Sequence, residues 1–279
     1  MTSGAMWQGD VGRAWAAEAE LTDRSFAPLT RALLARIAEG TPSQVLDIGC
    51  GAGELTLALA RQHSDARLCG LDISADLLAV ARERAAAAGL AGRVRFQLGD
   101  AEADQPAAAP DTLVSRHGVM FFADPPAAFA HLRAVATPAA RLAFTCFRAE
   151  RENGWAADVA ALVGAAPSPA ADPQSPPPPG PFAFADPAYV RALLTGAGWH
   201  DVVLEPVDYA YVAGAGADPV AEAMAFFRRI GPAARALRET PEAERAAVEA
   251  RITEWLHAHC REGVVSFPAA AWIVTARAA

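Results

Sequence analysis

Lysine is missing from this sequence, and all 24 of its basic residues are arginine. The 32 acidic residues outnumber them, which gives a formal net charge of −8. A protein that binds nucleic acid needs a basic surface to neutralise phosphates. We therefore expect no nucleic-acid partner, and a small molecule is the partner that this composition favours.

Cysteine is scarce, since only Cys50, Cys69, Cys146 and Cys260 occur and they are scattered along the chain. A disulfide framework is therefore not expected. The sequence also lacks an uncharged apolar run long enough to cross a bilayer, and its N-terminus lacks the pattern of a secretory signal. We expect a cytoplasmic protein with no membrane partner. Hydrophobic residues nevertheless make up 53% of the 279 positions, enough to bury a substantial core.

Glycines recur at every second position directly after a predicted buried strand, Val45 to Ile48. They are Gly49, Gly51 and Gly53, and a helix is predicted to follow from Leu55 to Arg61. A strand, a glycine turn and a helix N-terminus together expose backbone N–H groups to which the polar end of a ligand can bind. The alternative is that the glycines only make a tight turn.

Glu54 occupies the position where a dinucleotide-binding fingerprint has its third glycine. A carboxylate in the first turn of the helix would face an approaching diphosphate. The loop therefore suits a ligand without phosphate, which makes a nicotinamide-dependent oxidoreductase the weakest functional alternative.

Acidic residues follow the next two predicted strands. Asp72 lies in the strand from Ala66 to Ser74, about twenty residues after the glycines, where a doubly wound sheet places a carboxylate against a ribose. We expect Ser74 to cap the helix from Ala75 to Ala88. Asp100 and Ala101 follow the third strand, Val94 to Gly99, and a turn-forming role is the alternative for Asp100.

The stretch from Asp47 to Gly53, Asp-Ile-Gly-Cys-Gly-Ala-Gly, resembles motif I of the class I S-adenosylmethionine-dependent methyltransferases. The stretch from Asp111 to Phe122 is similar to their motif IV. Trp7, Gly12 and Trp15 resemble one bacterial branch of these enzymes, which act on small molecules, although simple core packing is the alternative for the two tryptophans.

This resemblance implies an α/β fold, a Rossmann-like doubly wound sheet of seven strands in the order 3-2-1-4-5-7-6. It implies a final antiparallel strand inserted into the sheet. The resulting division is an N-terminal helical cap (1–40), a cofactor-binding core (41–147), a proline-rich insertion at the substrate rim (148–181) and the C-terminal half of the sheet with cap helices at about 215–262 (182–279).

The resemblance also implies a cofactor site for S-adenosylmethionine, with S-adenosylhomocysteine as product. Gly49 to Gly53 would hold the methionine end, Asp72 the ribose, and Asp100 with Ala101 the adenine. The other residues that we expect at this site are Asp47, Cys50, Ile73, Ser115 and Arg116.

Arg116 and His117 each leave two interpretations open. Arg116 would lie near the methionine carboxylate or form a salt bridge on the rim of the sheet. His117 follows the fourth strand and could act as a catalytic base, since an imidazole titrates near neutral pH. Relatives with a similar stretch often have Phe there, so lining the cofactor site or packing is the alternative.

Several elements are predicted outside these motifs. They are helical patterns through Glu20, from Phe26 to Ala38, after Asp124, from Trp155 to Gly164, from Tyr189 to Ala197, from Val220 to Leu237 and from Glu242 to Cys260, and strands from Arg141 to Phe147, Asp201 to Tyr211 and Ser266 to Ala276. The proline run at 176–181 predicts an extended connection rather than a ligand for a proline-binding domain. His257 and His259 are two apart on a helix and cannot share one ion, so no metal is expected.

The predicted function is methyl transfer from S-adenosylmethionine to O, N, S or C of a small-molecule acceptor by direct displacement. Two alternatives stay open, a lyase or cyclase that consumes the cofactor and a non-catalytic cofactor-binding module. The sequence does not select the acceptor, and a homodimer is an open alternative to a monomer.

Overall fold

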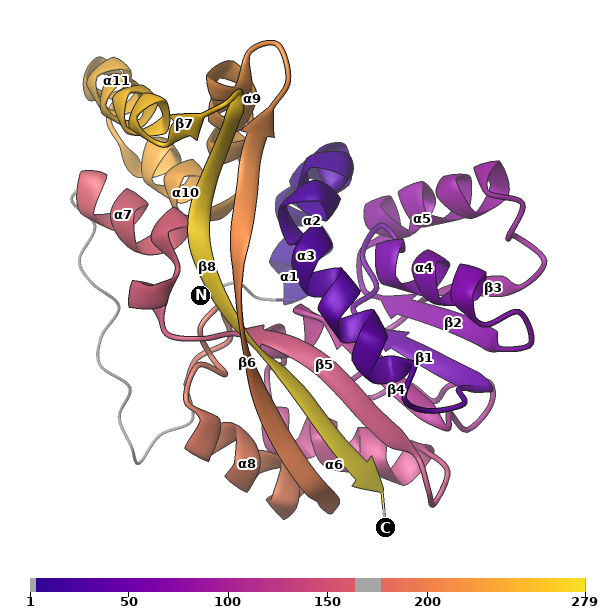
Figure 1. The fold of residues 1–279 in the computed structure, drawn as a ribbon. Coiled ribbons are helices and arrows are strands. Elements are labelled where there is room, and N and C mark those ends of the chain that lie inside the picture. Colours follow the sequence, from indigo (N-terminus) through magenta and orange to yellow (C-terminus); the bar gives the residue numbers. More distant parts are fainter. Residues whose placement is uncertain (1–3, 164–176, 279) are drawn as a thin grey trace.

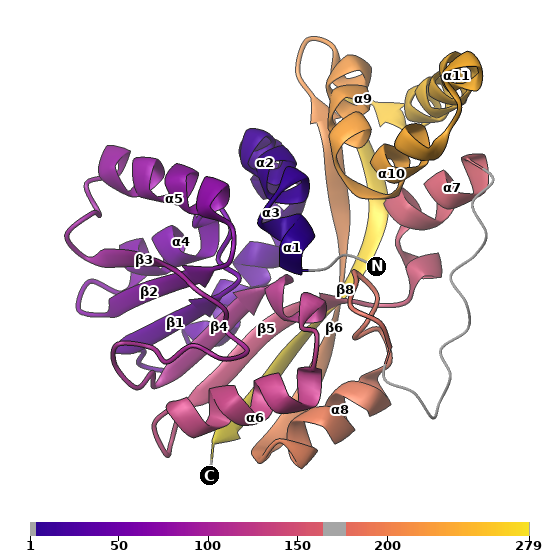
Figure 2. The ribbon, with the colours of Figure 1, turned by 180° about the vertical axis from the view of Figure 1, so that it is seen from behind.

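A single mixed sheet with helices on both faces organises the chain (Figure 1, Figure 2). The computed structural model describes residues 4–163 and 177–278. The strands are β1 (Gln44–Ile48), β2 (Arg67–Asp72), β3 (Val94–Leu98), β4 (Thr112–Arg116), β5 (Arg141–Phe147), β6 (Trp199–Ala215), β7 (Cys260–Arg261) and β8 (Val264–Ala278). The sheet order is β3-β2-β1-β4-β5-β8-β6, with β7 paired to β8.

The predicted strand order is confirmed, because β8, the last long strand, lies antiparallel between β5 and β6. The first five strands are parallel. The sheet has one strand more than predicted, the two-residue β7. The prediction of a helix up to Cys260 was wrong at its end, because Glu262 and Gly263 adopt positive φ and turn the chain back into β8.

The helices divide between the two faces of the sheet. They are α1 (Gly4–Trp7), α2 (Asp10–Ala17), α3 (Ala19–Ile37), α4 (Glu54–Gln62), α5 (Ala75–Ala87), α6 (Pro125–Val135), α7 (Gly154–Leu162), α8 (Pro187–Gly196), α9 (Pro219–Arg229), α10 (Gly231–Glu239) and α11 (Glu242–Ala258). Figures 1 and 2 show α3, α4 and α5 on one face and α6 and α8 on the other.

Local sequence signals start several of these helices. The Ser74 hydroxyl accepts a hydrogen bond from the Leu77 amide at the start of α5, as predicted. Asp124 and Asp186 cap α6 and α8 in the same way, each followed by proline at the first helical position. Pro206 lies in β6, which forms an edge of the sheet, where a missing N–H is tolerated.

Two helix predictions were wrong. The chain is helical through 21–25, where a gap between two helices was expected. The reason is that Thr22, Ser25 and Leu29 lie on one buried face of α3, which packs against the rest of the protein. The predicted helix from Val220 to Leu237 is two helices. The break comes where Ile230 is extended and Gly231, at φ +81°, precedes a proline.

Strands β6 and β8 continue well past the end of β5 and carry a separate layer of helices. Their pairing runs from Trp199 with Ala278 to Ala215 with Val264, whereas β5 pairs with β8 only as far as Ala271. Figure 1 shows α9, α10 and α11 around this extension, beside α7 and opposite α2. We call this part the cap. The proline run predicted at 176–181 begins outside the described residues.

Within the described ranges, no helix combines the length and the apolar character needed to cross a membrane.

Candidate cofactor and acceptor site

The loop between β1 and α4 holds three glycines in the left-handed region, with φ of +61° at Gly49, +54° at Gly51 and +80° at Gly53. A Cβ at Gly49 would lie 3.0 Å from Gly118 Cα, and one at Gly53 would lie 2.8 Å from Phe96 Cζ. These two positions need glycine for packing. A Cβ at Gly51 would meet no atom within 4 Å, so Gly51 faces open space.

Asp72, the last residue of β2, is bonded to this loop. Its carboxylate Oδ2 accepts a hydrogen bond of 2.8 Å from the Gly51 amide, and Oδ1 accepts one of 2.8 Å from the Ser74 amide. The side chain is buried, and burial raises the pKa of the carboxyl while the amides lower it. The structure therefore brings together two of the predicted cofactor-site residues, Gly51 and Asp72.

Asp100 and Ala101 lie beyond the end of the neighbouring strand β3. Leu98 pairs with Asp72, and the Gly99 amide donates to the Asp72 carbonyl at 3.0 Å. Ala101 is buried, whereas Asp100 is exposed and its Oδ1 accepts a hydrogen bond from the Glu102 amide at 2.9 Å. An adenine contact at this position stays a prediction.

Ser115 joins the end of β4 to the end of β1. Its hydroxyl donates to the Ile48 carbonyl at 2.7 Å and accepts from the Gly118 amide at 3.1 Å. The sheet order reverses between β1 and β4, and ligands of such sheets bind at the carboxyl ends of the strands at this point. Because the hydroxyl is fully buried and bonded to the backbone, Ser115 holds the crevice in shape.

Arg116 forms salt bridges, one of its two predicted alternatives. Its guanidinium lies 2.9 Å from Glu54 Oε2 and 3.0 Å from Asp23 Oδ1, and it donates to Thr30 Oγ1. Arg84 also pairs with Asp23, at 2.7 Å. These contacts tie α3 to the first turn of α4. No sequence motif pointed to Asp23, which lies 93 positions from Arg116.

Asp47 and Cys50 are buried at the base of the loop. The Thr56 hydroxyl donates to Asp47 Oδ2 at 2.5 Å, Oδ1 has no hydrogen-bond partner among the described residues, and burial raises the pKa of this carboxyl to about 7. Cys50 packs against Gly70, and burial keeps the pKa of its thiol well above the usual value. Both side chains support the loop from below. Ile73 lies near α1, since a Cβ at Gly4 would be 3.7 Å from Ile73 Cδ1.

The N-terminal helices lie over this side of the loop. A Cβ at Gly12 would be 2.4 Å from Ser74 Oγ, so α2 approaches the start of α5 closely. The Trp7 ring lies 5.5 Å from that of Trp15 and 5.1 Å from that of Phe121, measured between centroids. The Trp7 indole nitrogen is buried and has no partner in the part of the chain that the structure describes.

His117 directly follows β4 and adopts φ +67°, a conformation that is uncommon outside glycine. Its ring stacks on Phe147 at 4.1 Å and meets the Phe26 ring edge at 5.0 Å, both between centroids. Nδ1 lies 3.5 Å from Thr145 Oγ1, and Nε2 has no partner within the described chain. Burial and Arg116 lower the pKa of the imidazole to about 3, so the ring is neutral at physiological pH.

Phe26 and Phe147, which contact this histidine, belong to a connected group of five aromatic rings that we call the aromatic wall. They are Phe26 of α3, Phe147 of β5, Trp155 of α7, Phe182 in the turn before α8, and Tyr211 of β6. Trp155 and Tyr211 are nearly parallel, with centroids 5.4 Å apart. The family resemblance placed the substrate rim at 148–181, but it did not identify these rings as a group.

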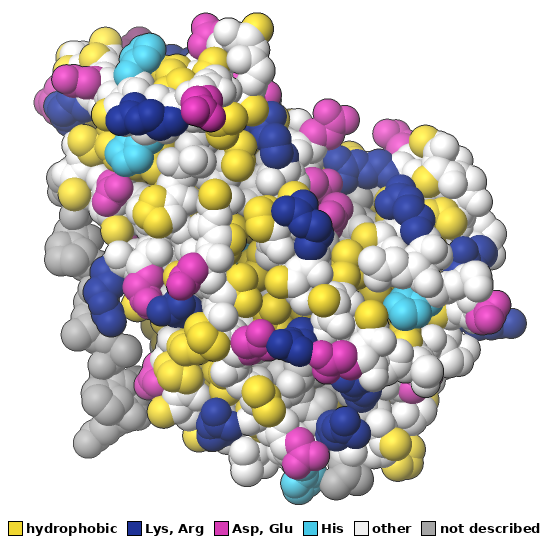
Figure 3. Space-filling model, viewed as in Figure 1, with side chains coloured by type: hydrophobic (Ala, Val, Ile, Leu, Met, Phe, Trp, Pro, Cys, Tyr) yellow, Lys and Arg dark blue, Asp and Glu magenta, His cyan; other side chains and the backbone are white. Residues whose placement is uncertain are grey.

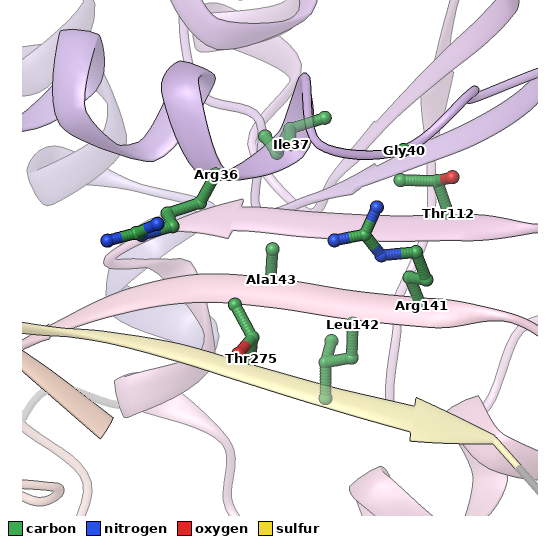
Figure 4. A pocket seen from close by; sticks show the side chains of 8 residues that line it. All are labelled: Arg36, Ile37, Gly40, Thr112, Arg141, Leu142, Ala143 and Thr275. Carbon is green, nitrogen blue, oxygen red and sulfur yellow. The ribbon is translucent and has the colours of Figure 1, made fainter. Parts of the chain in front are cut away.

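A cleft at the opposite end of β4 and β5 is too small to hold a cofactor. Thr112 and Arg141, the first residues of those strands, line it together with Arg36 (Figure 4). Its volume is about 10 Å³, room for little more than one water molecule.

The inserted antiparallel strand distinguishes this sheet from the dinucleotide-binding one, whose strand order runs 3-2-1-4-5-6. Together with the glycine loop after β1, it gives the sheet the Rossmann-like architecture seen in methyltransferase structures. Residues 41–165, a little under half of the chain, match the family model described as a methyltransferase domain.

Among known proteins, the chain is similar to the trans-aconitate 2-methyltransferase of Afipia carboxidovorans, with 46% identity over 72 residues, 25% of this chain and 28% of that enzyme. It is also similar to the demethylmenaquinone methyltransferase of Thermus thermophilus, with 37% identity over 105 residues, 37% of this chain and 47% of that enzyme. The matched region therefore spans less than half of either relative.

Among solved structures, the [4+2]-cyclase SpnF shares the fold, with a TM-score of 0.57 and 19% identity over 99% of this chain and 96% of that one.

Proposed function

We propose that this protein transfers a methyl group from S-adenosylmethionine to a small-molecule acceptor. The observation that carries the proposal is the open space at Gly51 beside the buried carboxylate of Asp72, at the point where the sheet order reverses. The methyltransferase family match of residues 41–165 and the two relatives support the reaction type.

The chain's own groups fit the proposed cofactor. Gly49 to Gly53 would accept its methionine end where no side chain obstructs it, and Asp72 has lone pairs left to accept hydrogen bonds from ribose hydroxyls. Asp100 and Ala101 would contact the adenine. Asp47, Cys50, Ile73, Ser115 and Arg116 would complete the site, chiefly by fixing the loop and its neighbours.

The bound cofactor would supply a sulfonium, whose methyl group is activated toward displacement. The protein would then contribute mainly by holding the acceptor in line with that methyl group, since orientation alone can lower a barrier by several kcal/mol. The N-terminal helices over the loop would exclude water. We propose that the core at 41–147 holds the cofactor, while the segments after Arg148 and after Tyr211 bind the acceptor.

The test is titration calorimetry of S-adenosylhomocysteine with the full chain and two alanine variants. Gly51 and Gly89 both have positive φ and open space where a Cβ would lie, so Gly51→Ala and Gly89→Ala carry the same backbone strain. Only Gly51 lies beside Asp72. We expect Gly51→Ala to weaken binding about tenfold or more and Gly89→Ala to leave it within about twofold.

Equal affinities for Gly51→Ala, Gly89→Ala and the unmodified chain would overturn the proposed site. Failure of the unmodified chain to bind S-adenosylhomocysteine would overturn the proposed function.

A further inference from the structure

His117 Nε2 is a buried hydrogen-bonding atom that the described chain leaves without a partner. A buried polar group without a partner costs about 1–3 kcal/mol. The residue also holds a left-handed backbone conformation at the crevice, and unusual conformations of this kind concentrate at functional sites. Packing alone would be served by an apolar ring, so the nitrogen itself needs an explanation.

The neighbours of the ring decide what Nε2 can do. The backbone amide of His117 donates to the Thr145 carbonyl at 3.2 Å, and the ring nitrogen Nδ1 lies 3.5 Å from the Thr145 hydroxyl. A neutral imidazole carries one ring proton, and in the tautomer with this proton on Nδ1 the other nitrogen, Nε2, keeps a lone pair. Nε2 can therefore accept a hydrogen bond from a hydroxyl group.

The charges near the crevice argue against an anionic acceptor. Arg116 is paired with Glu54 and Asp23, and Arg148 with Glu152 and Asp208. Arg24, on the face of α3 toward β6, is paired with Glu222. Figure 3 shows basic and acidic side chains interspersed on the face it presents. A polycarboxylate would have to break these ion pairs, whereas an apolar molecule would not.

We propose that the acceptor is a planar apolar molecule with a hydroxyl group, held among the rings of the aromatic wall, and that His117 Nε2 accepts a hydrogen bond from this hydroxyl. Nε2 is shielded from solvent, so an acceptor reaches it only when a neighbouring group moves. The inference rests on the proposed function. Of the two relatives, the demethylmenaquinone enzyme is named for a substrate of this apolar kind and the trans-aconitate enzyme is not.

In the reaction, the acceptor's nucleophilic oxygen or ring carbon forms a bond to the methyl carbon. The bond between that carbon and the sulfonium breaks, its electron pair stays on sulfur, and the acceptor proton leaves to solvent base. A neutral His117 orients the hydroxyl in this scheme and does not keep the proton.

The test compares two probes of nearly the same shape, 1-naphthol and 1-methoxynaphthalene, by calorimetry on the full chain with and without S-adenosylhomocysteine. His117→Phe keeps an aromatic ring against Phe147 but removes the acceptor nitrogen. We expect it to weaken 1-naphthol binding about tenfold and to change 1-methoxynaphthalene binding by less than about twofold. His117→Asn, which keeps an acceptor oxygen, should restore part of the preference for 1-naphthol.

Tyr189→Phe is the matched control, because it removes another buried polar atom without a partner among the described residues, the hydroxyl of Tyr189 on α8. It should leave both affinities unchanged. Equal effects of His117→Phe on the two probes, or tighter binding of trans-aconitate than of 1-naphthol by the unmodified chain, would overturn the inference. 1-Naphthol binding is measured with and without S-adenosylhomocysteine. A chain that binds 1-naphthol but not S-adenosylhomocysteine would count against the proposed function and not against this inference.

Discussion

Asp47 and His117 should shift the pH dependence of folding in opposite directions. Both are buried and both are shifted toward their neutral forms, with the pKa of Asp47 raised from 3.8 to about 7 and that of His117 lowered from 6.5 to about 3. Burial is the leading cause in each case. The perturbations that separate them are Asp47→Asn and His117→Phe, each of which removes one titration.

The signs follow from the protons that each state binds. Between about pH 4 and 6.5, native Asp47 keeps a proton that the unfolded chain loses, so its contribution to stability is full below pH 3.8 and is lost as pH rises toward 7. Over the same range, His117 of the unfolded chain binds a proton that the buried native ring does not bind. Its contribution is full above pH 6.5 and is lost as pH falls toward 3.

Each group that is fully shifted changes the free energy of unfolding by about 1.4 kcal/mol per pH unit. The two contributions therefore cancel between about pH 4.5 and 6.5 in the unmodified protein. In Asp47→Asn only the histidine remains, so stability should gain about 3 kcal/mol relative to the unmodified chain as pH rises over these two units. In His117→Phe, stability relative to the unmodified chain should fall by a similar amount over the same two pH units.

The assay is urea unfolding at about pH 4.5, 5.5 and 6.5, with stability extrapolated to water. Tyr189→Phe serves as a control, because burial raises the pKa of that phenol above 10, outside the range tested. Curves of stability against pH that stay parallel in all four proteins would refute the claim that these two side chains are neutral in the native state.

Two further predictions concern the glycine loop and the ion pairs above it. Gly53→Ala should destabilise the fold by about 2–4 kcal/mol, because the new Cβ would lie 2.8 Å from Phe96 in addition to the backbone strain. This effect should exceed that of Gly89→Ala, whose Cβ meets no atom. Equal stabilities of the two variants in urea unfolding would contradict the prediction. Asp23→Asn removes the partner shared by Arg84 and Arg116, so hydrogen exchange in α3 should become faster, and unchanged exchange would show that these ion pairs do not hold the helix.

Local signals in the sequence determined the parts of this protein that depend on near neighbours. The strand, glycine turn and helix around Gly51 are encoded within about twenty residues, as are the Ser74, Asp124 and Asp186 caps. Such features depend on residue types at spacings of two to four, which can be read directly. The sheet order followed from the family resemblance.

Tertiary structure decided how the site is lined. Whether Arg116 pairs with Asp23, and whether Phe26 meets Tyr211, depends on residues far apart in the chain that α3 and β6 bring together. The available Nε2 of His117 likewise results from what packs around it. No short-range pattern encodes such contacts, because they arise only when separate elements pack against the same end of the sheet.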